Sequence, residues 1–87
     1  MIDYAAARTL MVDTQIRTEG VTDYRLIRAM NEVPRERFVP SRARPFAYTD
    51  IDIAVKEDGH VRHMIRPATL ARLIQAAAIA PTDFVLV

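Results

Sequence analysis

The strongest constraint on the fold of this chain of 87 residues lies in its last seven, Pro81-Thr-Asp-Phe-Val-Leu-Val87. Pro81 closes an alanine-rich helical stretch, Thr82 and Asp83 suit a polar turn, and residues 84–87 are apolar without interruption. Such a run is typical of a strand that is buried on both faces at the centre of a parallel sheet. We therefore predict an inner strand over residues 84–87, and the rest of the interpretation depends on it.

This predicted strand has no partner within the chain. In α/β folds that bind nucleotides, the first strand leads into a glycine-rich turn that holds the cofactor. Neither such a turn nor a later strand follows Val87 in this sequence. An isolated strand leaves backbone donors and acceptors unpaired beside an apolar surface. We therefore expect the front part of a larger enzyme, with residues 1–81 as an N-terminal extension and residues 82–87 as the first strand of a second domain.

Capping residues and apolar spacing predict the first two helices. Asp3 is a suitable N-cap for a helix to about Glu19, with Gly20 as its left-handed stop. Its apolar stripe contains Ala5, Val12 and Ile16, widened by Tyr4 and Met11, but Arg8 interrupts it. The second helix has Thr22 as its predicted N-cap and ends before Pro34. Its predicted core face contains Leu26, Ile27, Met30 and Val33.

The remaining segments predict a hairpin followed by a third helix. Three prolines within residues 34–50 indicate turns or a short helical piece, which the aromatic residues Phe38, Phe46 and Tyr48 would hold against the helices. The alternation around Ile51, Ile53 and Val55 predicts a strand, with a turn over 56–59 and a partner strand over 60–65. Pro67 suits the first position of a helix to Ala80. The core face of this helix is predicted as Leu70, Leu73, Ile74 and Ala77. The expected fold is mostly α, with about three helices, a small β-hairpin and one terminal strand.

Charge and composition exclude several classes of protein. Twelve basic and eleven acidic residues leave a net charge of +1, which argues against a nucleic-acid partner. The absence of cysteine excludes disulfides and zinc–thiolate sites and suits the cytoplasm. No signal peptide and no apolar run of membrane-spanning length is present, so no membrane partner is expected.

Two local clusters suggest binding sites and have simpler explanations. His60 and His63 lie near Asp58, but three or four converging ligands are needed for zinc, so we expect no metal site. The most basic window, opposed locally only by Glu36, suits solvated arginines or ion pairs within the protein better than a nucleic-acid surface. Its basic residues are Arg35, Arg37, Arg42 and Arg44.

Several pieces of the sequence, in order and at similar spacing, resemble the N-terminal region of protein-L-isoaspartate O-methyltransferases. The most specific part is Val33-Pro-Arg-Glu-Arg-Phe-Val-Pro40 followed by Ala47-Tyr48-Thr49-Asp50. The other matching pieces are Met11-Val12, Gln15-Ile16-Arg17, Gly20-Val21, Asp23, Ala29-Met30, Pro67 at the start of a helix, and Asp83-Phe-Val-Leu-Val87.

This resemblance implies an enzyme of the Rossmann-like class that transfers a methyl group from S-adenosylmethionine to a protein or peptide carboxylate, a protein-repair reaction. It implies that the first two helices are an N-terminal extension, that the third precedes the sheet, and that residues 84–87 are the first strand of the methyltransferase domain. The loop that holds the cofactor would follow Val87. We therefore expect this chain alone to hold no cofactor-binding residue, to bind no S-adenosylmethionine and to be inactive.

The sequence departs from the family where the substrate is contacted. The resemblance implies a Gly-x-Thr-x-Ser-type segment before Pro67, but the threonine position falls on His63 and the serine position on Ile65. Neither side chain offers a small hydroxyl, so we assign no catalytic residue. Arg62, His63 and Arg66 are candidates for binding a different anionic group at the substrate lip.

Besides nucleic-acid binding through the arginines of the basic window, two alternatives remain open at this point. One is a methyltransferase relative with a different acceptor. The other is a helical interaction module without catalytic activity, which would form a homo-oligomer through Phe84, Val85, Leu86 and Val87.

Overall fold

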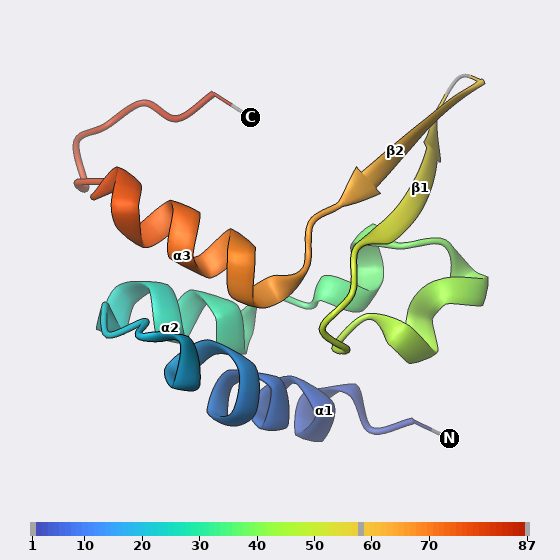
Figure 1. Cartoon of the computed structure of the whole chain (residues 1–87), viewed down its shortest axis with the longest axis horizontal. Helices are drawn as coiled ribbons and strands as arrows, with labels where there is room; N and C mark the ends of the chain where they lie inside the picture. The colour runs from blue at the N-terminus through green and yellow to red at the C-terminus, as the bar shows by residue number, and fades with distance from the viewer. Residues whose placement is uncertain (1, 58, 87) are drawn as a thin grey trace.

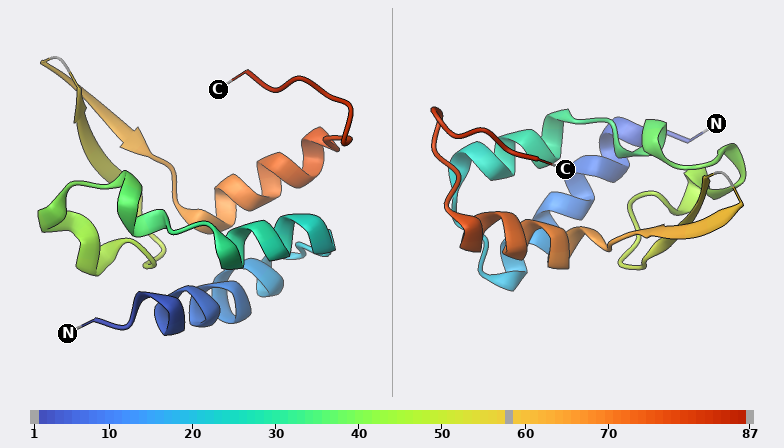
Figure 2. Two further views of the ribbon diagram at one scale, coloured as in Figure 1. Left: turned by 180° about the vertical axis from the view of Figure 1, so that it is seen from behind. Right: turned by 90° about the horizontal axis from the view of Figure 1, so that it is seen from above.

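The computed structural model describes residues 2–57 and 59–86. Helices α1, α2 and α3 gather at one end of the molecule, and the β-hairpin projects from the other (Figures 1 and 2). A π-helical segment and 3-10 turns complete the structure. In chain order the elements are α1 (Tyr4–Met11), π-helical η1 (Val12–Ile16), 3-10 η2 (Arg17–Glu19), α2 (Tyr24–Glu32), 3-10 η3 (Arg35–Phe38) and η4 (Ser41–Phe46), β1 (Ile53–Glu57), β2 (His60–Met64) and α3 (Pro67–Ala77).

The first helical stretch begins and ends as its sequence signals predict. The Asp3 carboxylate accepts a hydrogen bond from the backbone N–H of Ala6 at 3.0 Å, and Gly20 adopts a left-handed conformation with φ of 80°. Between these ends the helix widens into the π-helical η1. The hydroxyls of Thr14 and Thr18 each donate to the carbonyl four residues earlier, at 2.7 Å, a contact that competes with regular helix geometry.

The second helix differs from its prediction at both ends. Its N-cap is Asp23 and not Thr22: the Asp23 carboxylate accepts from the backbone N–H groups of Arg25 and Leu26, at 3.0 and 3.4 Å. The helix ends before Pro34, as predicted, but Val33 is exposed and not a core residue. Because a residue before proline is forced out of the α region, Val33 is extended and leaves the helical stripe.

The third helix begins at Pro67, as predicted, but ends at Ala77, where Ala78 adopts a left-handed conformation. The predicted core face is partly wrong. Its buried residues are Pro67, Ala68 and Ala71, whereas Leu73 is 58% exposed and Ala77 is exposed. α3 packs against both η1 and α2. Of the predicted core residues, Leu70 and Ile74 are partly buried, and Ile74 packs against the core cluster.

The hairpin forms with the predicted antiparallel pairing, with Ile53 opposite Met64 and Val55 opposite Arg62. Ile51 precedes β1 and is exposed. Of the three aromatic residues expected to pin residues 34–50, Tyr48 is buried, while Phe38 and Phe46 are exposed. The prediction is therefore wrong for two of the three.

The predicted terminal strand is absent from residues 84–86, which pair with no strand and have exposed side chains. Val87 lies outside the described residues. The physical reason is that strand geometry is held by pairing, and β1 and β2, the strands described, pair with each other in a hairpin. The polar turn before this segment does form: the Asp83 carboxylate accepts from the Ala80 N–H at 2.7 Å.

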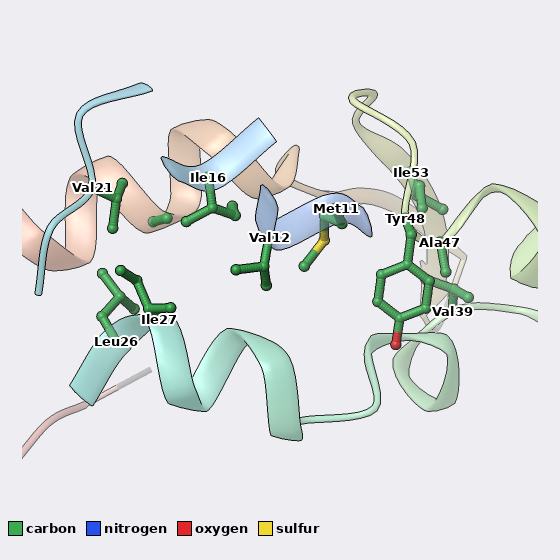
Figure 3. Packing of buried hydrophobic residues seen from close by; sticks show 11 residues of the cluster. Met11, Val12, Ile16, Val21, Leu26, Ile27, Val39, Ala47, Tyr48 and Ile53 are labelled. Atoms are coloured by element: carbon green, nitrogen blue, oxygen red, sulfur yellow. The ribbon is translucent and has the colours of Figure 1, made fainter. Parts of the chain in front are cut away.

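The hydrophobic core has two ends (Figure 3). Residues of the first helical stretch meet α2 at one end, where Ile16 is completely buried. At the other end the loop containing Ala47 and Tyr48 meets the base of the hairpin. The buried residues of the core cluster are Met11, Val12, Ile16, Val21, Leu26, Ile27, Val39, Ala47, Tyr48, Ile53 and Ala71.

We predict that Ile16→Ala lowers the free energy of unfolding by about 2–5 kcal/mol, because it leaves a cavity in the core. Chemical denaturation followed by circular dichroism measures the change. Leu10→Ala, on the same helical stretch but 62% exposed, is the matched control and should change stability by less than about 0.5 kcal/mol. Equal losses in the two variants would contradict the core described above.

Candidate functional site

Three side chains from distant parts of the sequence form a polar cluster beside the core. Arg8 Nη2 lies 3.2 Å from Glu36 Oε1, and Arg8 Nε donates to the Tyr48 hydroxyl at 2.8 Å. The Tyr48 hydroxyl in turn donates to Glu36 Oε1. The Arg8 guanidinium also lies 5.6 Å from the centroid of the Tyr48 ring, within range of a cation–π contact. We call Arg8, Glu36 and Tyr48 the Arg8 cluster.

The charges of the Arg8 cluster support one another. Burial alone would raise the pKa of the Glu36 carboxyl, but hydrogen bonds from Tyr48, the backbone and Arg8 outweigh it, so the pKa is lowered. Burial and the hydrogen bond to Glu36 raise the pKa of Tyr48. The hydrogen bond with Tyr48 is the main cause of the raised pKa of Arg8. The cluster is therefore an ionised carboxylate held between a cation and a neutral phenol.

This arrangement suits a structural role better than a catalytic one. Each member of the Arg8 cluster is bonded to the other two, and the Arg8 and Glu36 side chains are largely buried. Gln15 reinforces the cluster, since its Nε2 donates to the backbone carbonyl of Tyr48 at 2.7 Å. The cluster thereby joins the first helical stretch, η3 and the loop before β1.

Arg35, on η3, is buried and makes a second link. Its Nε donates to the Ala47 carbonyl at 2.7 Å, and its Nη2 donates to the Ile65 carbonyl at 2.8 Å. Burial lowers its pKa. Phe38, three residues further along η3, is exposed. Arg35 therefore fixes the segment that leads into α3, which contains the candidate substrate lip.

The candidate lip residues lie on and just after β2, and they do not converge on one site. Arg62 and His63 are exposed, and as neighbours on a strand they project to opposite faces. Arg66 is held instead by Asp52, whose Oδ1 accepts from the Arg66 backbone N–H at 2.8 Å and lies 3.4 Å from Arg66 Nε. The backbone hydrogen bond from Arg66 is the main cause of the lowered pKa of Asp52. Ile65 is partly buried.

Sequence reasoning missed the Arg8 cluster and the burial of Arg35. One signal was present: Arg8 interrupts the apolar stripe of its helix, and it proves to be a polar residue with partners in the interior. The expectation of solvated arginines or ion pairs in the basic window is wrong for Arg35, which is buried and donates to backbone carbonyls, whereas Arg37, Arg42 and Arg44 are exposed. The partners of these residues lie 12 to 40 positions away, so local patterns could not identify them.

The described part of the chain has neither a cluster of metal-ligating side chains nor a membrane-spanning helix. Among the described side chains, at residues 2–55 and 59–86, no group of three or more His, Cys, Asp or Glu residues could hold a metal ion. Asp58, which the sequence places near the two histidines, lies outside these ranges. None of the helices described combines the length and the apolar character needed to cross a bilayer.

Comparison with known proteins supports the resemblance stated above. Residues 7–86 match the family model described as protein-L-isoaspartate(D-aspartate) O-methyltransferase. The chain is similar to the protein-L-isoaspartate O-methyltransferase of Koribacter versatilis, with 40% identity over 83 residues, which is 95% of this chain and 36% of that protein. The corresponding proteins of Roseiflexus sp. and Methylorubrum extorquens are 36% and 39% identical, over 98% and 97% of this chain and 37% and 36% of their own lengths. The chain thus spans little more than a third of these relatives.

We predict that Glu36→Gln lowers the free energy of unfolding at pH 7 by about 1.5–3 kcal/mol, because it removes the charged acceptor of two side-chain hydrogen bonds. The pKa of Glu36 is lower in the folded state than in the unfolded chain. Its contribution is therefore complete above the unfolded value of about 4.3 and is lost as the pH falls through the folded value. The difference in stability between the unmodified chain and the variant should shrink below about pH 4.

Denaturant titrations between neutral and acidic pH measure this difference. Glu19→Gln is the control, because the exposed Glu19 lies 4.0 Å from its partner Arg72, and its loss should change stability by less than about 0.5 kcal/mol. A Glu36→Gln effect that stays constant down to the acid transition would show that the charge of Glu36 does not stabilise the fold.

Proposed function

Because this chain belongs to the protein-L-isoaspartate(D-aspartate) O-methyltransferase family, we propose that the protein containing it transfers a methyl group to a carboxylate of a protein or peptide. The observation that carries this proposal is the match of residues 7–86 to the family, in which nearly the whole chain takes part. S-adenosylmethionine is the proposed methyl donor, as the family resemblance implies.

The structural links described above support a positioning role for this region. Segments 33–40 and 47–50, the most specific part of the resemblance, contain Arg35, Glu36 and Tyr48. Through Arg35 these segments bond to the backbone of Ile65, two residues before α3 begins. In this proposal the most specific motif positions the backbone of the candidate substrate lip, and other groups carry out the reaction.

The residues of this chain do not fit S-adenosylmethionine. Both glycines of the chain have other structural roles. Gly20 ends the first helical stretch, and Gly59 adopts a positive φ between the two hairpin strands. No glycine-rich turn is therefore present to approach the cofactor closely. We propose that this chain alone is inactive and that residues 84–87 become the first strand of the methyltransferase domain when a longer chain supplies neighbouring strands.

The acceptor site departs from the family, and this defines the second part of the proposal. Methyl transfer to a carboxylate uses a nucleophile that is already ionised, so the enzyme contributes mainly positioning and electrostatics. At the positions of the family hydroxyls stand the exposed imidazole of His63 and the partly buried, apolar Ile65. We propose that the acceptor is an anionic group other than isoaspartate, contacted by donors from Arg62, His63 or Arg66.

We predict that a chain continuing past Val87 through the next domain binds S-adenosylmethionine in isothermal titration calorimetry, while the 87-residue chain binds none. Hydrogen exchange should show residues 84–86 protected in the longer chain and unprotected in the shorter one, because pairing protects backbone N–H groups. The shorter chain serves as the matched control.

Failure of the longer chain to bind would overturn the proposed methyltransferase. Light scattering would then decide the interaction-module alternative, which the exposed side chains of Phe84, Val85 and Leu86 favour. That alternative requires an assembly that resists dilution and disappears when residues 82–87 are removed.

We predict that His63→Thr combined with Ile65→Ser, in the longer chain, raises kcat/KM for an isoaspartyl peptide by on the order of 10²-fold, since it restores a donor that orients the nucleophile. The rate is measured as the formation of methylated peptide over time, detected by mass spectrometry. The control is His63→Ala combined with Ile65→Ala, which removes the same bulk without adding hydroxyls. An equal increase in kcat/KM in this control would show that the effect comes from the removal of side-chain bulk and not from hydrogen bonding by the added hydroxyls.

A further inference from the structure

A shallow groove of about 620 Å³ lies between η3, the start of η4 and the first strand of the hairpin. Two of its lining residues, Arg37 and Arg42, are positively charged and exposed. Phe38, which also lines the groove, is 63% exposed. The remaining lining residues are Val39, Pro40 and Val55.

The two arginines of this groove are not neutralised by the carboxylate nearest in sequence. Glu36 is the one acidic residue among positions 35–44, and it turns away to bond with Arg8 and Tyr48. Arg35, the other nearby cation, donates to backbone carbonyls in the interior. Among the side chains that the structure describes, at residues 2–55 and 59–86, no carboxylate pairs with Arg37 or Arg42. The Arg8 cluster therefore leaves positive charge on this surface.

The chemistry of the groove favours an acidic peptide over a nucleic acid. Two guanidinium groups are suited to carboxylates, which they can bind with paired hydrogen bonds. The exposed ring of Phe38 gives an apolar contact for a side chain between those carboxylates. A nucleic-acid surface would need a larger excess of positive charge and several aromatic rings for stacking, whereas this chain has a net charge of +1.

We propose that Arg37, Phe38 and Arg42 bind a segment of the protein substrate in which acidic residues flank an apolar one. That the bound protein is a substrate rests on the proposed function, whereas the binding itself can be tested separately. The groove would hold the acceptor protein at a distance from the lip and select acidic surroundings of the methylated residue.

The binding step is tested with the 87-residue chain and a fluorescent peptide that carries Asp and Glu on both sides of a leucine. Fluorescence anisotropy gives the affinity. Arg37→Gln combined with Arg42→Gln should weaken binding about tenfold, as each exposed ion pair is worth up to about fivefold. Arg28→Gln is the control, because Arg28 is an exposed arginine on α2 that does not line the groove. This variant should change the affinity for the peptide by less than about twofold.

Three further probes separate the possible occupants. A peptide with Asn and Gln in place of Asp and Glu should not bind. Phe38→Ala should weaken binding of the leucine peptide more than binding of the same peptide with alanine in place of leucine. Inorganic phosphate and an oligothymidylate of equal charge should compete poorly. The proposal is overturned if the acidic peptide does not bind, if the double variant binds as well as the unmodified chain, or if the oligonucleotide binds as tightly as the peptide.

The link to methyl transfer is tested in the longer chain. Acceptor peptides with acidic flanks should have a lower KM than neutral ones, and the double arginine variant should remove this difference while kcat stays the same. An unchanged difference would overturn the groove as a substrate site even where methyl transfer is intact. Acidic-peptide binding by the short chain together with no methyl transfer by the long one would instead reject the proposed function and leave the binding site standing.

Discussion

The contact among Arg8, Glu36 and Tyr48 decides how the parts of this small protein are joined. Arg8 comes from the first helix, Glu36 from the turn after the second, and Tyr48 from the loop before the hairpin. A cation and an anion that are both shielded from water cost free energy unless they are paired and hydrogen-bonded. Both conditions are met here, so the helices and the hairpin end are held in one arrangement. With Glu36 engaged in this way, Arg35 is free to enter the interior and Arg37 to face solvent.

Features governed by neighbouring residues could be predicted from the sequence. Asp3, Gly20, Pro34 and Pro67 act through their own backbone preferences or through bonds to the next turn, and the structure places each where it was expected. The choice of buried face could not be predicted so well. On α3 it depends on how the helix lies against η1 and α2, and in the folded chain Ala68 and Ala71 are buried while the more hydrophobic Leu73 is exposed.

The candidate site shows the same division. The candidate lip residues and the departures at His63 and Ile65 come from the family resemblance along the chain and stay predictions. The burial of Arg35 depends on the carbonyls of Ala47 and Ile65, which become its neighbours only in the folded chain. The run at 84–86 is the reverse case, because its local preference for a strand is clear but the structure described contains no free edge that it joins. The family assignment therefore rests on the sequence match and not on that strand.

The π-helical η1 has a consequence for how this region tolerates changes in length. A π turn accommodates about one more residue than an α turn over the same rise, so the side chains on either side of it keep their own facing directions. Loss of a single residue within Val12–Ile16 would let the stretch close into a regular α-helix, with Arg8 still directed at Glu36 and the end at Gly20 retained. Loss of one of the exposed residues of this segment, Asp13 or Thr14, is therefore compatible with the same fold.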